Sequence, residues 1–173
     1  MKSERLDHLK SKYGSSFHSL DARGVDVWET NKEQLIELLS SLKTQGYDVL
    51  TDLTGVDYLA PTKRTKVVYL LHHRQENEYL RITLYVARGE AIPSVTGLWS
   101  GADWYERELY DLFGIHFEGH PDLKRILMPD EWEGHPLLRD YALTEEVVQF
   151  KHGVKPKIPS EIIPYVSDNR RTK

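Results

Sequence analysis

The sequence predicts an α+β domain in which a mainly antiparallel sheet is flanked by helices, followed by an extended, proline-rich C-terminal segment. Three observations lead to this class. A strongly amphipathic helix pattern lies near the N-terminus, at residues 30–46. Three strand patterns follow between residues 47 and 88, and a short polar link separates the last two. Six of the eight prolines lie beyond residue 120, where we expect little regular structure.

The N-terminal part is predicted to hold two helices around a short strand. SERLDHLKSKYG (3–14) is typical of a short helix that ends at a glycine, and GVDVWE (24–29) predicts a strand with its tryptophan and its valines on opposite faces. In the helix at residues 30–46, Thr30 and Glu33 have the spacing of a capping box, and Gly46 ends the pattern. The apolar stripe of that helix consists of Leu35, Leu38, Leu39 and Leu42.

The three strand patterns differ in character. YDVLTDLTGVDYL (47–59) alternates and then breaks at Gly55, where we expect a bulge. TKVVYLLHHR (65–74) is a continuous apolar run, which is typical of a central strand covered on both faces. EYLRITLYVAR (78–88) alternates cleanly, and the preceding QENE predicts an antiparallel hairpin between the last two strands.

The last helix is predicted at residues 103–113, with Ser100 or Asp103 as its N-cap and Gly114 after its last turn. At the helical period, one stripe faces the core and a second carries an ion pair between Arg107 and Asp111. The core stripe is Tyr105, Leu109, Leu112 and Phe113, and the second stripe is Trp104, Arg107, Glu108 and Asp111. We therefore divide the chain into an α+β domain at 1–115 and an extended segment at 116–173, which we expect to wrap a partner.

Composition excludes several kinds of site. The chain has no cysteine, which rules out disulfides, thiol nucleophiles, cysteine zinc sites and cysteine-ligated iron–sulfur clusters. Residues 151–173 hold six basic and two acidic residues, a balance of +4, which leaves −8 on residues 1–150. An acidic body argues against nucleic acid as the main partner, and the basic tail fits an acidic protein surface better. The N-terminus lacks the apolar stretch of a signal peptide, so a cytoplasmic location is expected.

The charged residues around the last helix resemble an active site, but their spacing does not favour one. Glu106 and Glu108 lie about 200° apart around a helix, so their carboxylates cannot converge on one substrate atom. His116 and His120 have the i, i+4 spacing of helical zinc ligands, although glycines and a proline around them disfavour a helix. A stand-alone metal-dependent enzyme that uses both histidines and Asp111 therefore remains an alternative.

The stretch ERELYDLFGIHFEGHPDLKRIL (106–127) resembles the signature of the 30 kDa subunit family, the C subunit of respiratory complex I (NADH:quinone oxidoreductase). The positions that match are Glu106, Arg107, Glu108, Asp111, Leu112, Phe113, His120, Lys124, Ile126 and Leu127. The following MPDEWEGHPLLRDY (128–141) is also similar, with one departure at Leu138, where the family often has a basic residue. The resemblance covers residues 45–142 well.

The resemblance implies a structural subunit of the hydrophilic arm that holds no cofactor, because FMN, iron–sulfur clusters and quinone belong to other subunits. It implies that this chain contacts the quinone-site subunit (the D subunit) and the neighbouring iron–sulfur subunits, on the cytoplasmic side of the membrane, and binds no nucleic acid. The expected interface residues are Trp104, Arg107, Glu108, Asp111, His120, Lys124, Arg125, Met128, Trp132, His135, Arg139, Asp140 and Tyr141. Membrane-bound hydrogenases and photosynthetic complexes carry similar subunits, so an equivalent role there is a second alternative.

Overall fold

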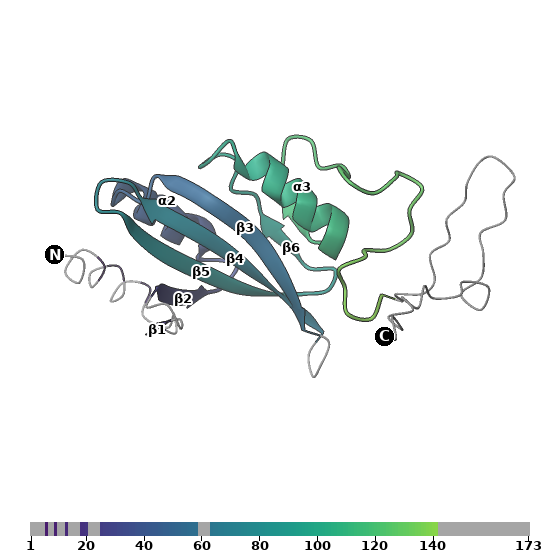
Figure 1. The fold of residues 1–173 in the computed structure, drawn as a ribbon, viewed down its shortest axis with the longest axis horizontal. Helices are drawn as coiled ribbons and strands as arrows, with labels where there is room; N and C mark the ends of the chain where they lie inside the picture. The colour runs from purple at the N-terminus through teal and green to yellow at the C-terminus, as the bar shows by residue number, and fades with distance from the viewer. Residues whose placement is uncertain are drawn as a thin grey trace, which may run out of the picture. The chain divides into compact units, whose positions relative to one another are not determined.

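The computed structural model describes residues 6, 9, 13, 18–20, 25–58 and 63–141, arranged as in Figure 1. The chain divides into two compact units, Met1–Tyr141 and Ala142–Lys173. The first unit extends beyond the domain limit predicted at residue 115, because residues 116–141 bond back to the preceding helix and to an earlier strand. The predicted extended segment beyond residue 141 lies outside the described residues, as does most of the predicted helix at 3–14.

The central sheet has five strands in the order β1-β2-β5-β4-β3. Their bounds are His18–Leu20 for β1, Asp26–Thr30 for β2, Val49–Tyr58 for β3, Arg64–His73 for β4 and Glu78–Ala87 for β5. Every pairing is antiparallel except that between β2 and β5. The predicted hairpin is confirmed, since β4 and β5 pair without interruption from Arg64 opposite Ala87 to His73 opposite Glu78. The α+β class with a mostly antiparallel sheet is therefore confirmed.

One face of this sheet forms the core. Val67, Tyr69 and Leu71 of β4 are fully buried there, together with the residues opposite them on β5. Lys66 and Leu70, on the other face of β4, are only half-buried. The prediction that this strand is covered on both faces is therefore wrong, because the described helices and the turn before the last helix contribute to one core on one side.

Helix α2, Leu35–Thr44, packs on this face with all four predicted leucines fully buried. Its predicted capping box is wrong, because Thr30 is the last residue of β2. Instead, the side-chain Oδ1 of Asn31 accepts the N–H of Gln34 at 2.9 Å. The predicted end at Gly46 is confirmed: this glycine has a φ of 99°, and the next N–H donates to the carbonyl of Leu42 at 3.1 Å.

The register of β3 shifts between Leu50 and Asp52, which places the bulge before Gly55, where the sequence predicted it. Gly55 itself stays in register, opposite Val67. A Cβ there would lie 3.0 Å from Leu109 and 3.2 Å from Phe113, both on the last helix. The glycine is therefore needed for the close approach of that helix to the sheet.

The last helix, α3, spans Ala102–Phe113 and lies beside β3 (Figure 1). Neither predicted N-cap is confirmed, since Gly101 precedes the helix and no side chain caps it. Gly114 ends the helix as predicted, with a φ of 73°. The chain then forms β7, His116–Glu118, parallel to β6, Ala91–Pro93. No helix in the described parts of the chain is long and apolar enough to cross a membrane.

Candidate protein-interaction site

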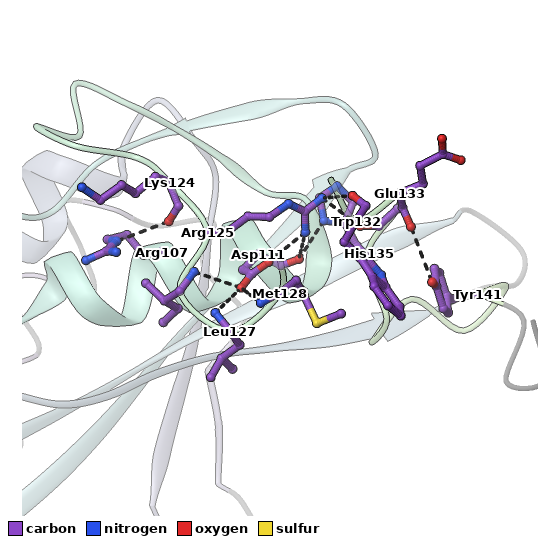
Figure 2. A network of polar contacts seen from close by, with 12 residues as sticks. Arg107, Asp111, Lys124, Arg125, Leu127, Met128, Trp132, Glu133, His135 and Tyr141 are labelled. Carbon is purple, nitrogen blue, oxygen red and sulfur yellow. Dashed lines mark hydrogen bonds and ion pairs between the residues drawn. The ribbon is translucent and has the colours of Figure 1, made fainter. Parts of the chain in front are cut away.

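Asp111, in the last turn of α3, organises the loop that follows β7. Its side chain is fully buried. Its Oδ2 accepts the backbone N–H groups of Ile126, Leu127 and Met128 at 3.1, 2.7 and 2.9 Å, as Figure 2 shows. Burial alone raises the pKa of this carboxyl, but these hydrogen bonds, with that of Arg125, bring it below its ordinary value. The carboxylate is thus charged at neutral pH and serves as an anchor for three successive amides.

Arg125 completes this anchor (Figure 2). Its guanidinium donates to Asp111 Oδ1 at 2.8 Å and, on the other side, to the carbonyls of Trp132 and Gly134, both at 3.1 Å. His135 donates from Nδ1 to the backbone carbonyl of Asp111 at 2.9 Å. A loop with little regular structure is therefore fixed to the end of α3 by one buried carboxylate and one arginine.

A second buried acid lies about one turn and a half earlier on α3. Glu106 is fully buried, and its two oxygens accept the N–H of Val95 at 2.6 Å and the hydroxyl of Ser94 at 2.7 Å. Burial raises the pKa of Glu106, and these two hydrogen bonds offset part of that rise. Nε2 of His120, whose side chain is also buried, lies 3.9 Å from Glu106 and 3.0 Å from Asp103. This cluster ties the start of the loop and the turn after β6 to the same helix.

The outward face of α3 has a different character. Trp104 is 62% exposed, and the guanidinium of Arg107 lies 4.8 Å from the centre of its ring. Arg107 also donates from Nε to the carbonyl of Lys124 at 3.3 Å. The predicted ion pair between Arg107 and Asp111 is therefore wrong, because Asp111 turns inward to Arg125. Leu127, 65% exposed, adds an apolar side chain in the loop that Asp111 anchors.

The structure thus divides the predicted interface residues into two groups. Asp111, Arg125, His120 and His135 make contacts within the chain. The exposed members are Trp104, Glu108, Lys124, Arg139 and Asp140, with Arg107, Met128, Trp132 and Tyr141 half-buried. That any of them contacts a partner stays a prediction.

Sequence reasoning missed four features of these networks: Asp57, Arg88, Ser94 and the burial of Glu106. The signal for Glu106 was its place in the stretch similar to the family signature. The partners of Asp57 are too far apart in sequence for any local pattern to indicate them.

A catalytic metal centre is not supported by the described residues, where no three metal-binding side chains of the histidine or carboxylate type gather at one point. His116 is exposed on β7, while the side chain of His120 is buried against Asp103. Both oxygens of Asp111 already accept hydrogen bonds. The alternative of a metal-dependent enzyme is therefore not favoured.

Comparison with known proteins decides the family. Residues 28–147, more than half of the chain, match the family described as "Respiratory-chain NADH dehydrogenase, 30 Kd subunit". The chain belongs to this family. One relative is the C subunit of NADH-quinone oxidoreductase from Neorickettsia sennetsu, 44% identical over 126 residues, which cover 72% of this chain and 68% of the relative. The same subunit of Geotalea uraniireducens is 44% identical over 138 residues, or 78% and 84% of the two chains. The resemblance recognised at residues 106–127 is thereby confirmed.

Other family members are longer, and two solved structures share the fold. The C/D subunit of NADH-quinone oxidoreductase from Bdellovibrio bacteriovorus is 44% identical over 127 residues, which are 73% of this chain but only 23% of that one. The trypsin-resistant fragment (1–134) of Nqo5 superposes with a TM-score of 0.62 at 32% identity, covering 69% of this chain and 99% of the fragment. A chain of an archaeal membrane-bound sulfane sulfur reductase, at 18% identity, gives 0.73 and covers 82% and 86%. That last likeness shows the fold alone.

Proposed function

We propose that this chain is a non-catalytic subunit of the hydrophilic arm of a proton-translocating NADH:quinone oxidoreductase. In this role it holds neighbouring subunits in place while electrons pass from NADH to quinone through groups bound elsewhere. Membership of the 30 kDa subunit family supports this role, and relatives at 44% identity carry the name of the C subunit of that enzyme. The alternatives in a hydrogenase or photosynthetic complex are not favoured by these relatives.

The observation that carries the non-catalytic role is the occupation of the acidic side chains on α3. Asp111 and Glu106 are both fully buried, and each accepts hydrogen bonds from its own chain on both oxygens. A general acid or base has to reach a substrate atom directly or through one water molecule. Carboxylates enclosed in this way stabilise a surface instead of reacting with a substrate.

We place the docking surface on the outward face of α3 and the loop beside it. Trp104 and Leu127 are the most exposed large apolar side chains among the described residues, and Arg107 lies beside Trp104 and bonds to the backbone of Lys124. Tryptophan and arginine are among the residue types that most often dominate the binding energy of protein interfaces. The anchored loop keeps this surface in shape before a partner binds, which lowers the entropic cost of association.

The quinone-site subunit, known by the letter D in this enzyme, is the proposed main partner. In relatives such as the C/D subunits of Bdellovibrio bacteriovorus and Azotobacter vinelandii, both letters belong to one polypeptide, so the two parts are neighbours there. Iron–sulfur subunits are further proposed neighbours, and association with the cytoplasmic side of the membrane would be indirect, through the complex. The chain has no cysteine to ligate a cluster, so FMN, iron–sulfur clusters and quinone are assigned to other subunits.

Charge reversal and truncation on the docking surface test this proposal. We expect Trp104→Ala combined with Arg107→Glu to reduce the amount of assembled complex at least about tenfold, because two anchor residues each contribute about 2 kcal/mol to an interface of this kind. The isolated variant chain should keep its circular dichroism spectrum and its thermal midpoint, since both side chains lie on the outward face of α3. NADH:quinone turnover per assembled complex should be unchanged.

The matched control is Tyr79→Ala with Arg64→Glu, which removes an exposed aromatic ring and reverses an exposed arginine on the sheet. This control should assemble like the wild type. Normal assembly of the Trp104 and Arg107 variant with lost turnover would overturn the proposal, because the residues would then act in the reaction and not in docking.

A further inference from the structure

Asp57, near the end of β3, joins three separate parts of the fold. It is 4% exposed. Its Oδ1 accepts the hydroxyl of Thr65 at 3.2 Å, and its Oδ2 accepts a guanidinium N–H of Arg88 and the backbone N–H of Arg139, both at 2.9 Å. Thr65 lies on β4, Arg88 follows β5, and Arg139 lies close to the end of the first compact unit. The carboxylate therefore connects the sheet to the last residues of that unit.

Arg88 extends this connection outward. One end of its guanidinium binds Asp57, and the other donates to Asp140 Oδ2 at 2.5 Å. Lys63 lies 3.7 Å from the same oxygen of Asp140. The Arg88 guanidinium holds the pKa of Asp140 below its ordinary value. The side chain of Arg88 is 26% exposed, so its contacts are less screened than those of a surface ion pair.

Apolar packing does little to hold this part of the loop. A cavity of about 240 Å³ lies there, lined by Val86, Phe113, Ile115 and Leu138 together with Arg88 and His135. The loop is bonded on one side of the cavity through His135 to Asp111 and further along the chain through Arg139 to Asp57. Because apolar contacts are incomplete between these points, the polar contacts decide where residues 138–141 lie.

We propose that Asp57, Arg88 and Asp140 form an anchor that fixes the point and direction in which the chain leaves the compact unit for residues 142–173, and so presents that segment to the quinone-site subunit. Arg88 is the positioning residue, since it alone among them binds both carboxylates. The inference rests on the proposed function for the identity of the partner. The existence of the anchor is independent of it.

Two measurements on the full-length chain test this anchor. Amide hydrogen exchange in the free chain reports the opening of residues 135–141, and titration with the purified quinone-site subunit reports the affinity. We expect Arg88→Gln to speed exchange at residues 138–141 about tenfold or more and to weaken binding of that subunit by a similar factor.

A second variant keeps the test valid if loss of Arg88 destabilises the fold. Asp140→Asn cuts only the outer contact and leaves the buried pair of Asp57 and Arg88 intact, so we expect the same changes at reduced size. Arg88→Lys, which keeps the charge but not the two-sided geometry, should recover part of the affinity. The control is Asp130→Asn, an exposed acid of the same loop, which should change neither exchange nor affinity.

The outcomes separate the anchor from the proposed function. Exchange at residues 138–141 that is unchanged in both Arg88→Gln and Asp140→Asn would overturn the anchor. Faster exchange with unchanged affinity for the quinone-site subunit would overturn its role in presenting the segment. If the wild-type chain itself failed to bind that subunit, the proposed function would fall, and the exchange measurement alone would decide whether the anchor exists.

Discussion

Replacing Asp111 by asparagine should release the loop after β7 from α3. The carboxylate accepts three backbone N–H groups through one oxygen and Arg125 through the other. Asparagine keeps the shape and offers one acceptor oxygen, which can serve the three amides or Arg125 but not both. Removing one partner of a buried ion pair costs about 3 to 5 kcal/mol. Because a folded domain is stable by only about 5 to 15 kcal/mol, a loss of this size is easily measured.

Hydrogen exchange and urea denaturation are the assays for this variant. We expect the amides of Ile126, Leu127 and Met128 to lose most of their protection and the free energy of unfolding to fall by about 3 to 5 kcal/mol, less if the freed loop is hydrated. Glu108→Gln, an exposed acid on the same helix, is the control and should change the stability by less than about 0.5 kcal/mol. Unchanged protection of the three amides in Asp111→Asn would refute the role assigned to the carboxylate.

The pH dependence of this difference has a definite sign. The folded-state pKa of Asp111 is below its ordinary value of 3.8, so the native state binds fewer protons than the unfolded state as the pH falls. The stabilising contribution is fully present above the unfolded pKa and is lost as the pH falls through the folded pKa. The gap in stability between the wild type and Asp111→Asn should therefore be constant from about pH 6 to about pH 5 and shrink below about pH 4.

Two further predictions concern the packing of α3. Gly55→Ala should destabilise the fold by about 1 to 3 kcal/mol in urea denaturation, because the new Cβ would lie 3.0 Å from Leu109. Gly97→Ala, whose Cβ would meet nothing within 4 Å, is its control, and equal effects at the two sites would contradict the packing argument. Since burial raises the folded pKa of Glu106, the wild type should lose stability as the pH rises from the unfolded value near 4.5 through the folded pKa. Glu106→Gln should lack this dependence in denaturation curves between about pH 4 and about pH 8, and identical slopes would exclude the assignment.

Local patterns in the sequence predicted the elements whose structure depends on local periodicity. The four leucines of α2 follow the helical period and are all fully buried, and the alternation in residues 78–88 became β5 with its apolar side inward. The turn at Gly114 was predictable because a left-handed residue favours glycine. The family signature at residues 106–127 also identified the segment that contains both buried acids of α3.

Contacts between distant residues could not be predicted in the same way. The i, i+4 rule paired Asp111 with Arg107, but the tertiary fold supplied Arg125 from a loop without regular structure. Gly55 was taken for a bulge because its reason, the approach of α3, arises from residues far along the chain. The parallel pairing of β2 with β5 likewise depends on the path of the chain around α2, which no single strand pattern records.

Affinity capture of the full-length chain from gently extracted membranes tests the central claim most directly. We predict that the captured material contains the quinone-site subunit and oxidises NADH with quinone as the acceptor, and that flavin and iron are found in the assembly but not in the separately purified chain. Recovery of the chain by itself, with a stoichiometric bound metal and an activity of its own, would contradict the assignment as a non-catalytic subunit.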